Sequence, residues 1–171
     1  MAKVPRSENI PAKGGEKQST ECLELYFEEK DYMDIKYRNH LSAEDYLLLR
    51  KAVGFCEIPQ HQAENGLRNT AYQVAAADGD RTVGMARILW DGGYTAYLAD
   101  VVVHPDYQGK HIGYEMIENI LNYLQSQMEP GDKILLNLEA AKGKEPFYLK
   151  LGFEMRPSGH LGSGMSQWLT K

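Results

Sequence analysis

Residues 98–113, LADVVVHPDYQGKHIG, combine an apolar strand with a short loop that leads into a helix. The strand ends at Pro105, and the glycines of the loop are placed to open a helix at Ile112. The first backbone N–H groups of a helix have no intrahelical acceptor, and the helix dipole favours negative charge beside them. The stretch therefore predicts an anion site that suits phosphate.

Hydrophobic periodicity over the rest of the chain predicts a mixture of strands and helices. Alternating apolar residues indicate half-buried strands, and apolar residues at helical spacing indicate one buried face of a helix. Tight turns connect three consecutive strands into an antiparallel meander, and a crossover helix then leads to a parallel strand. In chain order the predicted elements are strand 33–38, helix 43–53, a short helix or loop at 61–69, strands 72–77, 82–90 and 95–103, helix 112–127, strand 133–138, a short helix at 146–151, and strands 153–156 and 165–169.

Length and composition predict one folded domain preceded by a tail. The chain has 171 residues, of which 43% are hydrophobic, so it can bury a core of its own. Residues 1–20 are polar and rich in Pro, Gly, Lys and Ser, which predicts a flexible tail. We expect residues 21–171 to form the single domain.

Charge and hydropathy restrict the classes of partner. The formal net charge is −5 with no block of basic residues, which argues against a nucleic-acid partner. No stretch approaches the roughly 18 apolar residues of a membrane span, and the N-terminus lacks the apolar core of a signal peptide. Cys22 and Cys56 match no metal-binding spacing and are expected to be free thiols. Together these features predict a cytoplasmic protein without a membrane partner.

Two common phosphate motifs are excluded. The chain contains no G-x-x-x-x-G-K-[ST] string, so it has no Walker loop. The spacing from Gly109 to Gly113 does not match the G-x-G-x-x-G fingerprint of dinucleotide-binding folds, and the strands that precede it form a meander instead of alternating with helices.

The loop instead resembles the Gln/Arg-x-x-Gly-x-Gly/Ala motif of the GCN5-related N-acetyltransferase (GNAT) superfamily. Residues 108–113 read QGKHIG, and residues 147–153 read FYLKLGF, which is similar to the F-Y-x-K-x-G-F string of that family. The resemblance covers about residues 30–170 and indicates a small bacterial-type member. One position departs from the pattern, because His111 stands where the family usually has glycine.

The resemblance implies a fold and a cofactor. The fold is α+β, with a central, mostly antiparallel twisted sheet of about six or seven strands, one parallel crossover unit and flanking helices. The cofactor is acetyl-CoA as acyl donor, with no metal. Its pyrophosphate would bind the loop, and its pantetheine arm would pair with the preceding strand. The implied cofactor-binding residues are Val101, Val102, Val103, Gln108, Gly109, Lys110, His111, Ile112, Gly113 and Tyr114.

Acetyl transfer to an amine requires three catalytic tasks. The amine loses a proton, the negative charge on the carbonyl oxygen is stabilised by a donor such as a backbone N–H near Val102, and the leaving thiolate gains a proton. The resemblance implies the last task for Tyr148. Asp100 and Glu139 are the candidate general bases, and ordered water is a third option.

The predicted function is transfer of an acetyl group to a primary amine of a small molecule. The sequence does not identify that amine, because in this fold the acceptor site is formed by the most variable parts of the chain. Two alternatives stay open: an acyl-CoA-binding sensor without catalysis, and an acetyltransferase for lysines or N-termini of proteins. The sequence also leaves open whether the chain forms a homodimer.

Overall fold

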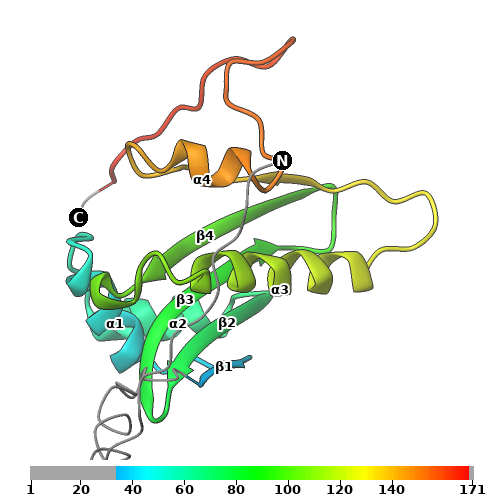
Figure 1. The fold of residues 1–171 in the computed structure, drawn as a ribbon. Coiled ribbons are helices and arrows are strands. Elements are labelled where there is room, and N and C mark those ends of the chain that lie inside the picture. Colours follow the sequence, from blue (N-terminus) through cyan, green and yellow to red (C-terminus); the bar gives the residue numbers. More distant parts are fainter. Residues whose placement is uncertain (1–33, 170–171) are drawn as a thin grey trace, which may run out of the picture. The chain divides into compact units, whose positions relative to one another are not determined.

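A computed structural model of the chain describes residues 34–169 and contains a five-stranded sheet with the strand order β1-β2-β3-β4-β5 (Figure 1). Strands β1 to β4 are antiparallel to their neighbours, whereas β5 runs parallel to β4. The elements are β1 (Ile35–Arg38), α1 (Ala43–Ala52), α2 (Gln60–Arg68), β2 (Tyr72–Asp78), β3 (Arg81–Trp90), β4 (Thr95–Val103), the 3-10 helix η1 (Pro105–Tyr107), α3 (Ile112–Ser126), β5 (Leu135–Asn137) and α4 (Glu145–Leu149). The predicted tail at 1–20 lies outside the described residues.

Helices α1 and α2 begin where local chemistry favours it. Ser42 caps α1, and its Oγ accepts a hydrogen bond of 3.0 Å from the backbone N–H of Asp45. The segment at 61–69, expected to be a short helix or a loop, is the helix α2. It follows Pro59 and buries Ala63 against α1, so tertiary packing selects the helix over the loop.

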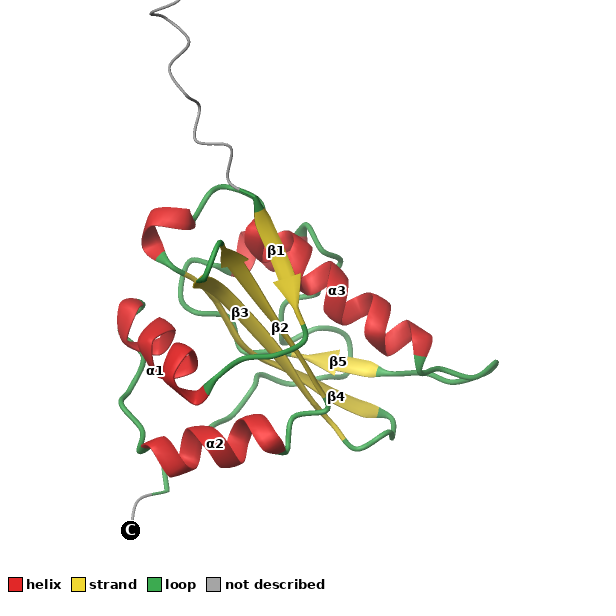
Figure 2. Cartoon of the chain, turned by 90° about the horizontal axis from the view of Figure 1, so that it is seen from below, coloured by secondary structure: helices red, strands yellow, loops and turns green. Residues whose placement is uncertain are grey.

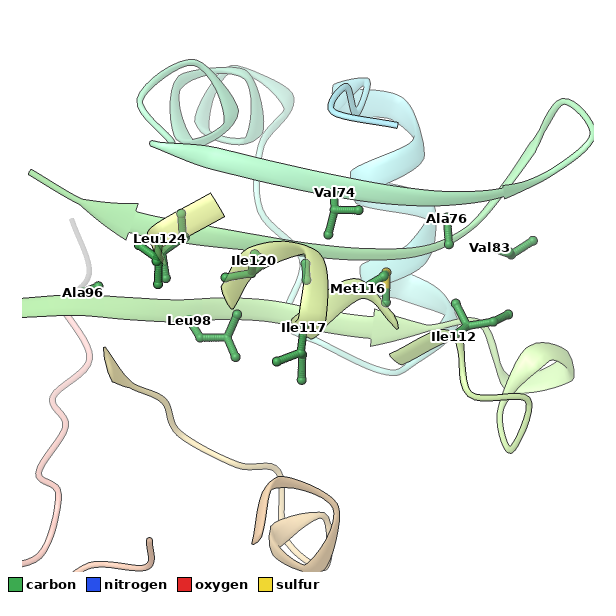
Figure 3. Packing of buried hydrophobic residues seen from close by; sticks show 12 residues of the cluster. Val74, Ala76, Val83, Ala96, Leu98, Ile112, Met116, Ile117, Ile120 and Leu124 are labelled. Carbon is green, nitrogen blue, oxygen red and sulfur yellow. The ribbon is translucent and has the colours of Figure 1, made fainter. Parts of the chain in front are cut away.

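The sheet has helices on both faces (Figure 2). Helix α3 packs on one face, where its apolar side chains join those of β2, β3 and β4 in the larger hydrophobic cluster (Figure 3). Helices α1 and α2 pack on the other face through a smaller cluster that includes Met85 and Val102. The α3 residues in the core are Ile112, Met116, Ile117, Ile120 and Leu124, which are the positions that the helical periodicity predicts.

Strands β4 and β5 pair over only a short length. Their register runs from Thr95 opposite Leu135 to Tyr97 opposite Asn137, where β5 ends. Strand β4 continues to Val103 with no β5 partner. Beyond Tyr97, β4 therefore has an open edge on the side of β5, as a strand-like ligand arm would require.

The predicted strands 153–156 and 165–169 are wrong for the described residues, and the sheet has five strands instead of six or seven. Between Ser158 and Leu161 there is a single bridge, and the rest of this segment has no regular structure. Apolar residues at its end are exposed, with Met165 at 98% and Trp168 at 82% of full exposure. An alternating apolar pattern forms a strand only where one of its faces is buried. In the described part of the chain, no other element covers these side chains.

Replacement of Ile120 by Ala tests the packing of α3. Ile120 is fully buried in the larger cluster, so Ile120→Ala is expected to lower the free energy of unfolding by about 2–5 kcal/mol. The exposed Gln125 on the same helix provides the control, since Gln125→Ala should change stability by less than about 0.5 kcal/mol. Chemical denaturation measures both, and equal effects would contradict the packing described here.

Candidate active site

The loop between β4 and α3 exposes the start of a helix. The first backbone hydrogen bond of α3 runs from the N–H of Glu115 to the carbonyl of His111, at 3.1 Å. The N–H groups of Ile112, Gly113 and Tyr114 precede it and point beyond the helix start. Gly109 has a φ of 77° and open space where a side chain would sit, so a ligand can approach the backbone there.

Contacts from three sides hold this loop against the sheet. The side-chain amide of Gln108 donates to the carbonyl of Val103 at 3.0 Å. The hydroxyl of Tyr107 donates to Asp78 at 2.8 Å, which joins the loop to the end of β2. Gly113 lies so close to α4 that an added Cβ would be 3.4 Å from the ring of Phe147. The predicted cofactor-binding residues at 101–103 and 108–114 are therefore neighbours in space.

His111 takes the backbone conformation that glycine would take. Its φ is 61° and its ψ is 0°, in the left-handed region. This conformation costs a residue other than glycine roughly 1–2 kcal/mol. Because the donors at the helix start are backbone groups, the histidine leaves them in place.

A second group of residues lines a cavity of about 790 Å³ between β5, α4 and residues 152–166. Tyr97, Glu139 and Tyr148 all lie on its wall. The ring of Tyr148 packs edge-on against Phe147 and Phe153. Burial raises the pKa of Tyr148 above its usual value, and the neighbouring Tyr97 adds to the effect. Tyr148 is thus a phenol that keeps its proton at neutral pH.

Comparison with known protein families shows to which family the chain belongs. The model of the acetyltransferase (GNAT) domain matches residues 68–155, which include the helix-start loop and Tyr148. The chain belongs to the GNAT family of N-acetyltransferases. The family resemblance and the α+β fold expected from the sequence are both confirmed.

Several GNAT proteins are similar over most of this chain. The uncharacterized N-acetyltransferase ycf52 of Pyropia yezoensis is 30% identical over 115 residues, which cover 65% of this chain and 64% of that protein. Its counterpart in Porphyra purpurea is 28% identical over 146 residues, or 82% of each chain. A probable acetyltransferase of unknown function from meticillin-resistant Staphylococcus aureus has a solved structure with a TM-score of 0.71 and 29% identity, covering 79% of this chain and 99% of that one.

Membership in the GNAT family implies use of an acyl-CoA donor. The residues present fit such a group: free N–H donors at the start of α3 match a diphosphate, and the open edge of β4 matches an extended arm. Within residues 34–169 no three His, Cys, Asp or Glu side chains are grouped as metal ligands. In the same part of the chain, every helix is too short or too polar to cross a bilayer.

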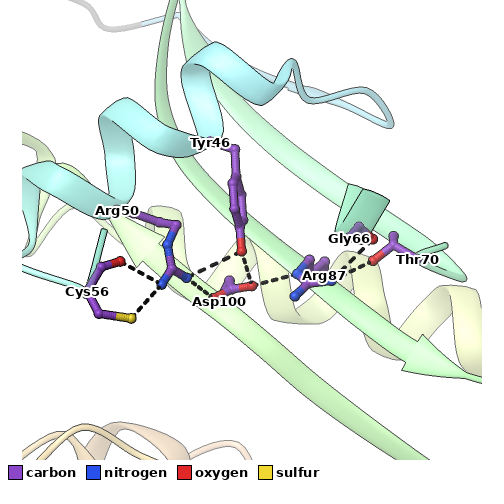
Figure 4. A network of polar contacts seen from close by, with 7 residues as sticks. All are labelled: Tyr46, Arg50, Cys56, Gly66, Thr70, Arg87 and Asp100. Carbon is purple, nitrogen blue, oxygen red and sulfur yellow. Dashed lines mark hydrogen bonds and ion pairs between the residues drawn. The ribbon is translucent and has the colours of Figure 1, made fainter. Parts of the chain in front are cut away.

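The two candidate bases lie in different places. Glu139 is exposed on the wall of the cavity with Tyr148. Asp100 does not line this cavity and instead accepts hydrogen bonds from Arg50, Arg87 and Tyr46 (Figure 4). The structure therefore brings Glu139 near Tyr148 and places Asp100 in a separate polar cluster.

Sequence reasoning missed three residues of these two groups. Tyr97 is one of them: burial and the charge of Glu139 raise its pKa. The register of β4 with β5, which places Tyr97 opposite Asn137, appears only in the tertiary structure. The others are Arg50 and Arg87. The sequence around Arg87 could have indicated its role, because Arg87 lies between Ala86 and Ile88, which are buried in β3. A charged side chain inside an apolar strand requires a partner.

Two substitutions of His111 test whether the helix-start loop depends on its left-handed residue. His111→Gly should change the free energy of unfolding by no more than about 1 kcal/mol, because relief of strain is offset by chain entropy. It should also retain affinity for acetyl-CoA. His111→Val should lower both stability and affinity, since a β-branched residue strongly disfavours positive φ. Calorimetric titration with acetyl-CoA measures this, and equal affinity of the two variants would contradict a role for this backbone geometry.

Proposed function

We propose that this protein is an acetyl-CoA-dependent N-acetyltransferase that acetylates a primary amine of a small molecule by direct attack. The observation that carries the proposal is the cavity lined by the protonated phenol of Tyr148 and the carboxylate of Glu139. Tyr97, where the pairing of β4 with β5 ends, lines the same cavity. A proton donor and a proton acceptor on one wall are what an acyl transfer between sulfur and nitrogen requires.

Each group has one task in this proposal. Acetyl-CoA, when bound, supplies an acetyl thioester. Glu139 accepts a proton from the amine, directly or through water, as the C–N bond forms. A backbone N–H near Val102 stabilises the negative charge on the carbonyl oxygen. Tyr148 donates its proton to the sulfur as the C–S bond breaks, and the products are an amide and a free thiol.

The unpaired edge of β4 supports the binding half of the proposal. Residues 101–103 have no β5 partner, and the carbonyl of Val103 accepts from the side chain of Gln108. The other outward backbone groups of this stretch can pair with the amide-containing arm of the cofactor. Hydrogen bonds to a charged group contribute about 1.5–3 kcal/mol each. Several N–H donors at the start of α3 therefore suffice to hold a diphosphate without a cluster of basic side chains.

Melting of the purified protein with and without acetyl-CoA tests the binding step. A ligand at about 100 times its Kd stabilises the native state by about 2.7 kcal/mol, so Tm should rise by several degrees. A thiol-release assay over a panel of small amines then tests turnover. A rise in Tm with thiol release on one amine supports the proposal. A rise without release on any amine or lysine peptide indicates a sensor, and no rise at saturating acetyl-CoA overturns the proposal.

Tyr148→Phe tests the proton donor. The substitution removes only the hydroxyl, so kcat should fall at least about tenfold while the Kd for acetyl-CoA changes little. Because the pKa of Tyr148 is raised, a loss of activity caused by its deprotonation should occur only above about pH 10. Steady-state kinetics across pH measure both. Tyr94→Phe provides the control, as Tyr94 is an exposed residue just before β4 that does not line the cavity of Tyr148. An unchanged kcat in Tyr148→Phe would remove Tyr148 from the mechanism.

A further inference from the structure

Asp100 is the centre of a half-buried ionic cluster (Figure 4). One of its carboxylate oxygens accepts from Nη1 of Arg50 at 2.9 Å, and the other accepts from Nε of Arg87 at 2.5 Å and from the hydroxyl of Tyr46 at 2.8 Å. The charged side chains are 11–15% exposed. Both oxygens therefore have hydrogen-bond partners within the protein.

The backbone at Asp100 is as unusual as its side chain. Its φ is 49°, in the left-handed region that residues other than glycine rarely adopt. The register with β3 shifts at this point, from Val102 opposite Met85 to Ala99 opposite Arg87. Two residues of β4 thus face one residue of β3, which is a β-bulge.

The bulge exchanges the positions of β4 whose side chains face α3 with those whose side chains face α1 and α2. Before it, Ala96 and Leu98 pack in the cluster beneath α3. With an unbroken period of two, Val102 would lie on that same face. Instead Val102 packs with α1 and α2, while Val101 and Val103 pack on the α3 side. The position of every residue from 101 to 103 therefore depends on the conformation of Asp100.

The same two arginines also reach the segments that connect α1, α2 and β2. Nη2 of Arg50 donates to the carbonyl of Cys56 at 3.1 Å. Nη1 of Arg87 donates to the hydroxyl of Thr70 at 3.2 Å, and to the carbonyl of Gly66 at 3.4 Å. One carboxylate thereby connects the bulge of β4 to both ends of the segment that contains α2.

We propose that Asp100 is a positioning residue that fixes the β4 bulge, and that it holds residues 101–103 and the α1–α2 connection in the arrangement that acetyl transfer requires. The inference rests on the proposed function for its kinetic consequences. It also separates the two carboxylates that the sequence offered as bases, since Asp100 acts on backbone geometry and Glu139 lines the cavity with Tyr148.

Asp100→Asn is the first test. Asn is close to Asp in size and also tolerates the left-handed region, so the change removes chiefly the charge that holds the two arginines. We expect the Kd and KM for acetyl-CoA to rise about tenfold or more, because small displacements of binding groups are costly. The pH profile of kcat should keep its shape. A general base would behave in the opposite way: kcat would fall, its pH profile would change, and the Kd for acetyl-CoA would stay the same.

Arg87 provides an independent variant, because it has no contact with the cavity of Tyr148. Arg87→Met should reproduce the rise in the Kd for acetyl-CoA, and Arg87→Lys should restore part of the affinity. In the double variant Asp100→Asn, Arg87→Met, the loss should be smaller than the product of the two single losses. Independent, multiplicative losses would overturn the proposal. If Asp100→Asn fails to fold, the two Arg87 variants test the same contacts.

Asp34→Asn is the matched control, because Asp34 forms an ion pair with Lys36 that is exposed on both sides. It should leave the Kd unchanged. Hydrogen exchange of the full chain adds a readout that does not need activity: Asp100→Asn should speed exchange in peptides covering residues 50–58 and 98–103, and Asp34→Asn should not. If the wild-type protein does not bind acetyl-CoA, the proposed function fails while this readout still decides the anchoring role. Unchanged exchange in Asp100→Asn would overturn that role.

Discussion

The left-handed backbone at Asp100 is the constraint on which the two faces of β4 depend. Side chains along a strand alternate with a period of two, so one inserted residue exchanges the faces of everything that follows. Such a residue remains in a strained conformation only where its surroundings over-determine it. Here Arg50 from α1 and Arg87 from β3 bind the carboxylate from two sides. An ion pair with this little exposure contributes little net stability, but loss of one partner leaves a charge without compensation.

Helix α3 combines two roles that lie at different places along its length. Its central residues Met116, Ile117 and Ile120 fill the core and hold the helix rigidly against the sheet. Its first turn leaves three N–H groups without an intrahelical acceptor. Because the helix is anchored by packing, the loop before it can hold His111 in a conformation that is locally unfavourable. Gly113 in the same turn lies close to Phe147 of α4, the helix that carries Tyr148.

The short pairing of β4 with β5 creates the rest of the site. A parallel strand of three residues leaves the last part of β4 without a partner, and the chain after β5 passes to α4. The cavity between β5, α4 and the segment after it is lined by two phenols, those of Tyr97 and Tyr148, and by three carboxylates, those of Glu139, Glu145 and Glu154. Burial raises the pKa of both Tyr97 and Tyr148, so each remains a hydrogen-bond donor at neutral pH. The cavity wall therefore buries the two tyrosines in part and supplies hydroxyl hydrogen-bond donors.

Sequence by itself determined the elements whose signals are local: the apolar periodicity of α3, the meander of β2 to β4, the cap at Ser42, and the helix-start loop with its family resemblance. It wrongly predicted closing strands at 153–156 and 165–169, because alternation does not reveal whether a face will be covered. Only the tertiary structure decided that Asp100 and Glu139 lie in different environments, that Tyr97 joins Tyr148, and that Arg87 finds its partner in β4. The physical reason is that periodicity acts over a few residues, whereas a buried charge or a cavity is defined by segments far apart in the chain.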